Sequence, residues 1–217
     1  MNDGTLSRAT ILAIAAGLAA WFAAALVAGS GGAFEVGPDE VPIRLVAAIL
    51  APPLLFGLAL LASARLRAAV LGLDQGLLTM LQGWRVVGAM FVVLYLHDLL
   101  PGLFAWPAGL GDLAVGLAAP FVAFAVIRGS TGWRGRVLWL NIAGLVDFAV
   151  AAGTGLLSTG TALGVLAGPV TSDLMAVSPL SLFPTFGVPL FIILHMASLY
   201  KLAAERESAV PGAVAHA

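Results

Sequence analysis

The stretch that decides the fold is residues 82–112, QGWRVVGAMFVVLYLHDLLPGLFAWPAGLGD. It consists of two apolar runs, with the pairs Pro101-Gly102 and Trp106-Pro107 between them. Proline and glycine pairs of this kind favour a reversal of the chain. The pattern therefore predicts two membrane-spanning helices joined by a short connection.

The whole chain has the same apolar character. Of its 217 residues 61% are hydrophobic and only 10% are charged, whereas a soluble domain is about 25% charged. No soluble core could cover so much apolar surface, so the expected solvent and partner is the lipid bilayer. The net charge of −1 provides no basic surface for nucleic acid, and the absence of cysteine excludes disulfides and thiolate metal sites.

Apolar runs of about 20 residues are long enough to cross a bilayer. They predict an all-α integral membrane protein with a six-helix bundle over residues 1–207 and a mobile tail at 208–217. The long connection 158–183 is expected to hold a short interfacial or re-entrant helix. The expected spans are approximately 9–29, 43–64, 77–100, 110–127, 137–157 and 184–203.

Lysine and arginine follow the expected loops unevenly. If both termini are cytoplasmic, Arg44 is the one basic loop residue that lies outside. The positive-inside rule therefore favours this orientation. The basic residues then placed on the cytoplasmic side are Arg8, Arg65, Arg67, Arg128, Arg134, Arg136, Lys201 and Arg206.

Several polar residues interrupt the apolar spans, where a charged side chain needs a partner. At a rise of about 1.5 Å per residue, Arg85, Asp147 and His195 lie at similar depths on three different spans, about 12–15 Å from the cytoplasmic end. Asn141 would join them from the inner side. We expect an Arg85–Asp147 ion pair with His195 beside it, serving either as a structural lock or as a ligand- or proton-handling site.

A second polar group flanks the reversal and consists of His97, Asp98, Trp106 and Asp112. One interpretation is an outward-facing vestibule for a cation or a proton, since histidine changes charge near neutral pH. The alternative is local: Asp98 caps backbone groups, and Asp112 complements the dipole at the start of its helix.

Two histidines within the apolar part also raise haem or another tetrapyrrole as a cofactor. His97 and His195 would reach matched heights if the third span began near Trp84. Signatures such as HExxH, GxSxG and the P-loop are absent, so no catalytic residue and no metal ligand is proposed. The GLGD sequence at 109–112 is similar to an intramembrane aspartyl protease motif, but the companion YD motif is missing.

Four motifs carry a family resemblance: QGWRVxGxxF at 82–91, FAxPAGxGD at 104–112, NxxGxxDF at 141–148 and PxFxVPxxxxxH at 184–195. Together they resemble small six-span proteins of the bacterial inner membrane that have no assigned activity. The resemblance implies a multi-pass protein of that membrane. The residues favour binding or transport of a small molecule or proton. The alternatives are a non-catalytic helical subunit, with partner subunits or a homo-oligomer, and a haem- or pigment-binding protein.

Overall fold

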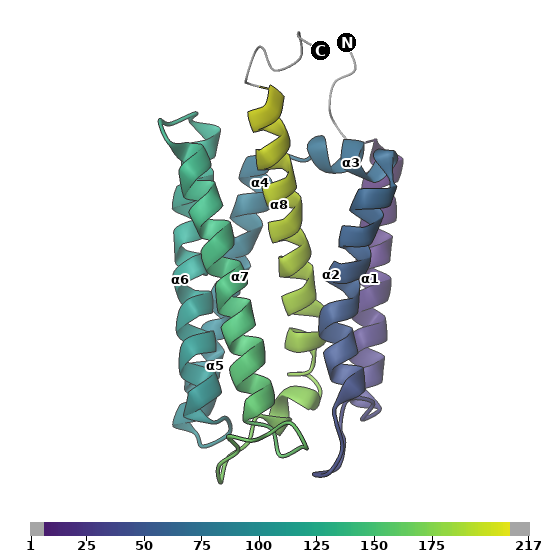
Figure 1. Ribbon diagram of the computed structural model, residues 1–217, viewed down its shortest axis with the longest axis vertical. Helices are drawn as coiled ribbons and strands as arrows, with labels where there is room; N and C mark the ends of the chain where they lie inside the picture. The colour runs from purple at the N-terminus through teal and green to yellow at the C-terminus, as the bar shows by residue number, and fades with distance from the viewer. Residues whose placement is uncertain (1–6, 209–217) are drawn as a thin grey trace, which may run out of the picture.

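The computed structural model describes residues 7–208, and these are helical without any strand (Figure 1). Six helical stretches are long and apolar enough to cross a membrane, which confirms the expected number. Four of them are single helices: α1 (Arg8–Ser30), α2 (Ile43–Ala62), α6 (Gly102–Ile127) and α7 (Trp133–Leu157). Residues 209–217 of the expected tail, with His216, lie outside the described residues.

The other two spans are composite. The third consists of α4 (Gln75–Leu81), the 3-10 helix η1 (Gln82–Ala89) and α5 (Met90–Leu96), and the sixth consists of the short π-helix η3 (Phe183–Gly187) and α8 (Val188–Ser208). The short helix α3 (Ala64–Leu71) lies across the end of the bundle at which α1 begins and α8 ends (Figure 1). We call this the terminal end. The opposite end, which carries the loops 31–42, 97–101 and 158–182, is the loop end.

The turn between the third and fourth spans is shorter than predicted. Helix α5 stops because Asp98 adopts a left-handed backbone conformation, with φ of 56°, a conformation that usually marks a helix end. Pro101 then precedes α6, which begins at Gly102 and continues through Pro107. The predicted start near residue 110 was wrong, because membrane helices tolerate an internal proline. Asp112 consequently lies in the third turn of α6 and not in its first.

Small residues bring α6 close to its neighbours. Ala105, Ala108 and Ala119 are at most 1% exposed, and a Cβ atom added to Gly116 would lie 2.6 Å from the backbone nitrogen of Val86. Such residues let membrane helices approach backbone to backbone. This packing places the middle of the third span directly against α6.

The segment 158–182 covers the loop end. It contains one 3-10 turn, η2 (Asp173–Ala176), where a short interfacial or re-entrant helix was expected. Asp173 holds the segment together, since its carboxylate accepts hydrogen bonds from the backbone nitrogen of Gly160 at 2.9 Å and from the hydroxyl of Thr171 at 2.9 Å. The helix α3 therefore lies across one end of the bundle and the segment 158–182 lies across the other.

Candidate functional site

A polar stripe runs down the interior face of the third span. Gln75, Thr79, Gln82 and Arg85 follow one another at helical spacing, and none is more than 5% exposed. Arg85 lies on η1, the 3-10 segment in the middle of the span. Such segments inside longer helices often mark hinges or functional positions. Arg85 therefore lies in a segment whose helix type differs from that of the α-helices on either side of it.

The Arg85 guanidinium is bonded on all sides. Its Nε donates to Asp112 Oδ1 at 2.7 Å, and its Nη2 donates to Asp147 Oδ2. Its Nη1 lies 3.1 Å from His195 Nε2 and 3.3 Å from the carbonyl oxygen of Gly144, to which it donates. One arginine thus joins α6, α7 and α8 in the interior of the bundle.

The charges of this centre do not balance. Asp112 and Asp147 share the single positive charge of Arg85, and both carboxylates contact it directly. With both carboxylates ionised the net charge is −1, and an uncompensated charge is costly in a medium of low dielectric constant. The centre is therefore suited to receive one further positive charge, either a proton or a cation.

The hydrogen bonds of His195 define its tautomer. Arginine can only donate, so Nε2 must accept from Arg85. Nδ1 lies 2.8 Å from Asn141 Oδ1, and the Asn141 amide donates to Ser198 Oγ at 2.9 Å. Nδ1 therefore carries the proton and donates it to Asn141. His195 is neutral in this arrangement and connects the charged centre to a neutral polar network.

This network continues towards the terminal end. Ser198 Oγ also accepts from Gln75 Nε2 at 2.6 Å. Among the described residues, Gln75 Oε1 and both polar atoms of Gln82 are buried without a hydrogen-bond partner. Buried polar groups of this kind are usually satisfied by ordered water. The terminal half of the bundle therefore has the polar lining that water requires.

Three glycines make room for the centre. A Cβ atom at Gly88 would collide with Asp112, one at Gly111 with Asp147, and one at Gly144 with His195. Gly111 and Asp112 belong to the GLGD sequence, in which Gly111 allows close packing and Asp112 pairs with Arg85. Substitution of any of these glycines would displace an ionisable side chain from Arg85.

The structure brings together Arg85, Asp147 and His195, which the sequence placed in one layer, and Asn141, which was expected to join them from the inner side. The second predicted group does not assemble. His97 and Asp98 are exposed at the turn after α5, and Trp106 packs against Tyr95 with ring centroids 5.6 Å apart. Asp112 lies instead against Arg85, because α6 begins earlier than expected.

A different set of residues forms a vestibule at the loop end. A cavity of about 240 Å³ lies between the α1–α2 loop and the segment 158–182. Its polar lining consists of Glu35, Thr159, Thr161, Ser172 and Asp173. Sequence reasoning missed this cavity because its walls come from two loops far apart in the chain.

The geometry does not fit bis-histidine haem ligation. Both ring nitrogens of His195 are engaged in hydrogen bonds inside the bundle, whereas His97 is exposed at the loop end. The described part of the chain also contains no cluster of three or more histidine or acidic residues arranged to hold a metal ion.

A family model for a domain of unknown function, DUF8737, matches residues 42–203. The chain belongs to the DUF8737 family. No curated protein and no solved structure shows a significant match to the chain. Arg85, Asp112, Asp147 and His195 all lie within the DUF8737 domain, whereas α1 lies outside it.

Proposed function

We propose that this DUF8737 protein is a multi-pass membrane protein that binds and transports a proton or a small cationic solute. The observation that carries the proposal is one guanidinium, that of Arg85, shared by Asp112 and Asp147 inside an apolar bundle. The centre lies about 15 Å from the loop ends of α6 and α7, as the helical rise implies. Ionisable groups at such depth are expensive and mark ion or substrate pathways.

Access routes on both sides support transport over a purely structural lock. From the loop end, a cavity of about 80 Å³ leads to Asp112. Towards the terminal end, the hydrogen bonds pass from His195 through Asn141 and Ser198 to Gln75. A structural ion pair would require neither the cavity nor the polar stripe.

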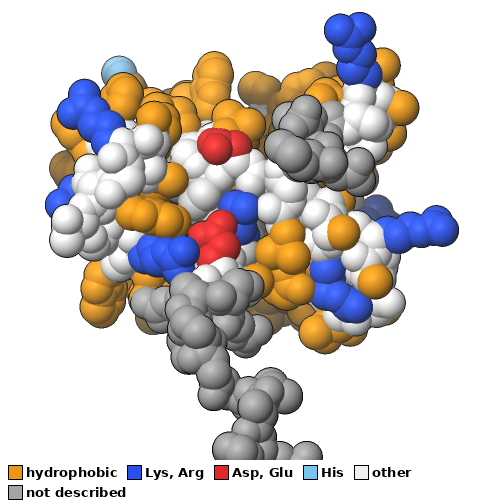
Figure 2. Space-filling model, turned by 90° about the horizontal axis from the view of Figure 1, so that it is seen from above, with side chains coloured by type: hydrophobic (Ala, Val, Ile, Leu, Met, Phe, Trp, Pro, Cys, Tyr) orange, Lys and Arg blue, Asp and Glu red, His pale blue; other side chains and the backbone are white. Residues whose placement is uncertain are grey.

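The orientation is part of the proposal. Lysine and arginine side chains lie at several places on the terminal end, whose outer sides are hydrophobic (Figure 2). Arg44, at the start of α2, lies at the loop end. By the positive-inside rule the terminal end faces the cytoplasm of a bacterial inner membrane, and the vestibule faces outward.

The test is proton flux into liposomes that contain the purified protein and an enclosed pH-sensitive dye. We expect an imposed potential to drive acidification with the native chain. Asp112→Asn and Asp147→Asn should each abolish it, while Asp98→Asn, at the exposed turn, should leave it unchanged. Native-like flux in both interior variants would show that the carboxylates only hold the bundle together.

A neutral triple variant separates structure from transport. Arg85→Gln with Asp112→Asn and Asp147→Asn removes every charge from the centre but retains polar side chains of similar size. We expect a monodisperse, folded protein without flux. Native-like folding together with native-like flux in this triple variant would refute the transport proposal. A protein that purifies only within a larger complex would favour the subunit alternative.

A further inference from the structure

The cavity beside Asp112, on its loop-end side, has the lining of a ligand site. Phenylalanine rings from four separate elements face it, and Asp112 is the one charged group among the described residues that line it. We propose that this cavity binds a small apolar organic cation, with its positive head at Asp112 and its body among the rings. The proposal rests on the transport function above and specifies its substrate class. The rings belong to Phe91, Phe104, Phe148 and Phe183.

The charge of the ligand follows from Asp112. Its Oδ1 accepts from Arg85, whereas its Oδ2 accepts no hydrogen bond from any described residue. The carboxylate side chain is 13% exposed, so part of it is accessible from the cavity. Since Arg85 is shared with Asp147, the Asp112 carboxylate can meet a cationic head without leaving a positive charge unpaired.

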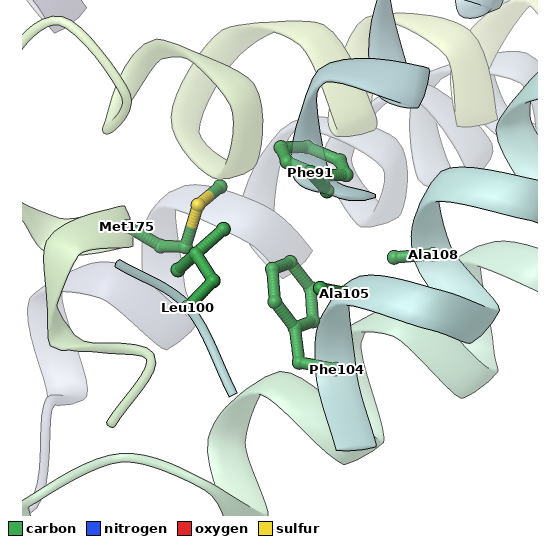
Figure 3. Packing of buried hydrophobic residues seen from close by; sticks show 6 residues of the cluster. All are labelled: Phe91, Leu100, Phe104, Ala105, Ala108 and Met175. Atoms are coloured by element: carbon green, nitrogen blue, oxygen red, sulfur yellow. The ribbon is translucent and has the colours of Figure 1, made fainter. Parts of the chain in front are cut away.

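The aromatic walls favour the same charge. A cation is attracted to the face of an aromatic ring, most strongly where water is excluded. The Arg85 guanidinium lies 3.8 Å from the centroid of the Phe148 ring, so one of these rings already contacts a cation in the native structure. Phe91 and Phe104 lie beside each other, with the flexible Met175 side chain facing the same space (Figure 3). Methionine adapts to ligands of irregular shape.

The route from the loop end suits a cation as well. The vestibule shares Leu45, Thr159 and Ser172 with the cavity, so the two spaces adjoin. Glu35 and Asp173 line the vestibule, and no lysine or arginine lines either space in the described part of the chain. An acidic entrance concentrates cations and repels anions.

The size of the cavity limits the ligand. A volume of about 80 Å³ is smaller than the roughly 150 Å³ that holds one benzene molecule in an engineered protein cavity. The cavity therefore has room for the ammonium head alone at most, and we place the single ring or short chain of the ligand towards the vestibule of about 240 Å³. Benzyltrimethylammonium has this shape, and neopentylbenzene is its uncharged carbon counterpart.

Binding to the purified full chain in detergent tests the proposal. We expect benzyltrimethylammonium to bind at least tenfold more tightly than neopentylbenzene or benzenesulfonate. Asp112→Asn should weaken it at least tenfold, and Phe104→Leu several-fold. Phe121→Leu, on the same helix and 76% exposed towards lipid, is the matched control and should change nothing. Equal binding of the neutral compound, as an acyl-chain site would show, overturns the proposal.

A second measurement does not depend on removing Asp112. The native chain has no cysteine, so Ala152→Cys in the cavity wall provides a single thiol. We expect benzyltrimethylammonium to slow its reaction with a small thiosulfonate reagent, and no protection would contradict the site. Proton flux without cation binding would refute the substrate class alone, whereas cation binding without any flux would refute transport.

Discussion

The carboxylate of Asp147 on α7 lies directly on the backbone of Gly111 on α6, in the space where a side chain at position 111 would begin. This contact allows α7 to pack closely on α6 while Asp147 still reaches Arg85. Close packing and ion pairing in this bundle therefore depend on the same glycine.

We expect Gly111→Ala to destabilise the protein by about 1–3 kcal/mol, as overpacking of an interior does, and to abolish proton flux. The added methyl group must displace the carboxylate of Asp147 from Arg85. Thermal unfolding in detergent and the liposome assay measure the two effects. Gly153→Ala on α7 is the control, because a Cβ atom there would contact nothing within 4 Å. Equal unfolding temperatures for the two variants would contradict this packing.

Because the centre has two carboxylates and one guanidinium, we expect removal of the positive charge to destabilise the protein more than removal of one negative charge. Arg85→Gln leaves two carboxylates buried without a cation and should cost about 3–5 kcal/mol. Asp112→Asn leaves a balanced Arg85–Asp147 pair and should be at least as stable as the native chain. Unfolding midpoints measured in one detergent test both variants. A greater loss in Asp112→Asn than in Arg85→Gln would show that the surplus charge is not costly.

The hydrogen bonds of His195 require a neutral ring with its proton on Nδ1. Nitrogen NMR of histidine-labelled protein at neutral pH should show this tautomer. The replacement of His97 and His216 by glutamine leaves one histidine and makes the assignment direct. Asn141→Leu removes the acceptor of the Nδ1 proton but leaves Arg85 donating to Nε2, so the ring should keep this tautomer. A doubly protonated ring in the native chain would contradict the arrangement.

The apolar pattern of the sequence was enough to predict the six spans, because hydrocarbon thickness sets helix length. The similar depths of Arg85, Asp147 and His195 could also be predicted from the sequence. An ionised group within lipid is stable only in the bundle interior, beside a partner. What such reasoning predicts is the set of groups that meet. It does not predict whether they serve stability or transport.

Asp112 was predicted in the outer polar group and not beside Arg85, for a specific physical reason. Pro107 was interpreted as part of a loop, although a membrane helix accommodates it within its second turn. Had α6 been started at Gly102, the helical rise alone would have placed Asp112 about 15 Å deep, level with Asp147. The vestibule could not be read in this way, because it depends on how the segment 158–182 folds over the loop end.

Gln82 offers a test for water in the terminal half of the bundle. Both of its polar atoms are buried without a partner among the described residues. We expect Gln82→Cys to react with a small, water-soluble thiosulfonate reagent, because water reaches this position. Leu77→Cys, on the same span but 55% exposed towards lipid, should remain unlabelled. An inert Gln82→Cys would mean that this half is dry.

Helix α1 stands apart from the rest of the bundle. It contacts the sixth span through Trp21 and Phe22, which pack on Phe186 with centroids 5.0 and 5.3 Å apart. The DUF8737 match at 42–203 contains five of the six spans. The matched segment begins at the loop end of the bundle, where α2 starts, and ends at the terminal end, in α8. Helix α1 therefore runs from the terminal end to the loop end, where the matched segment begins, and its described residues add no side chain to the Arg85 centre.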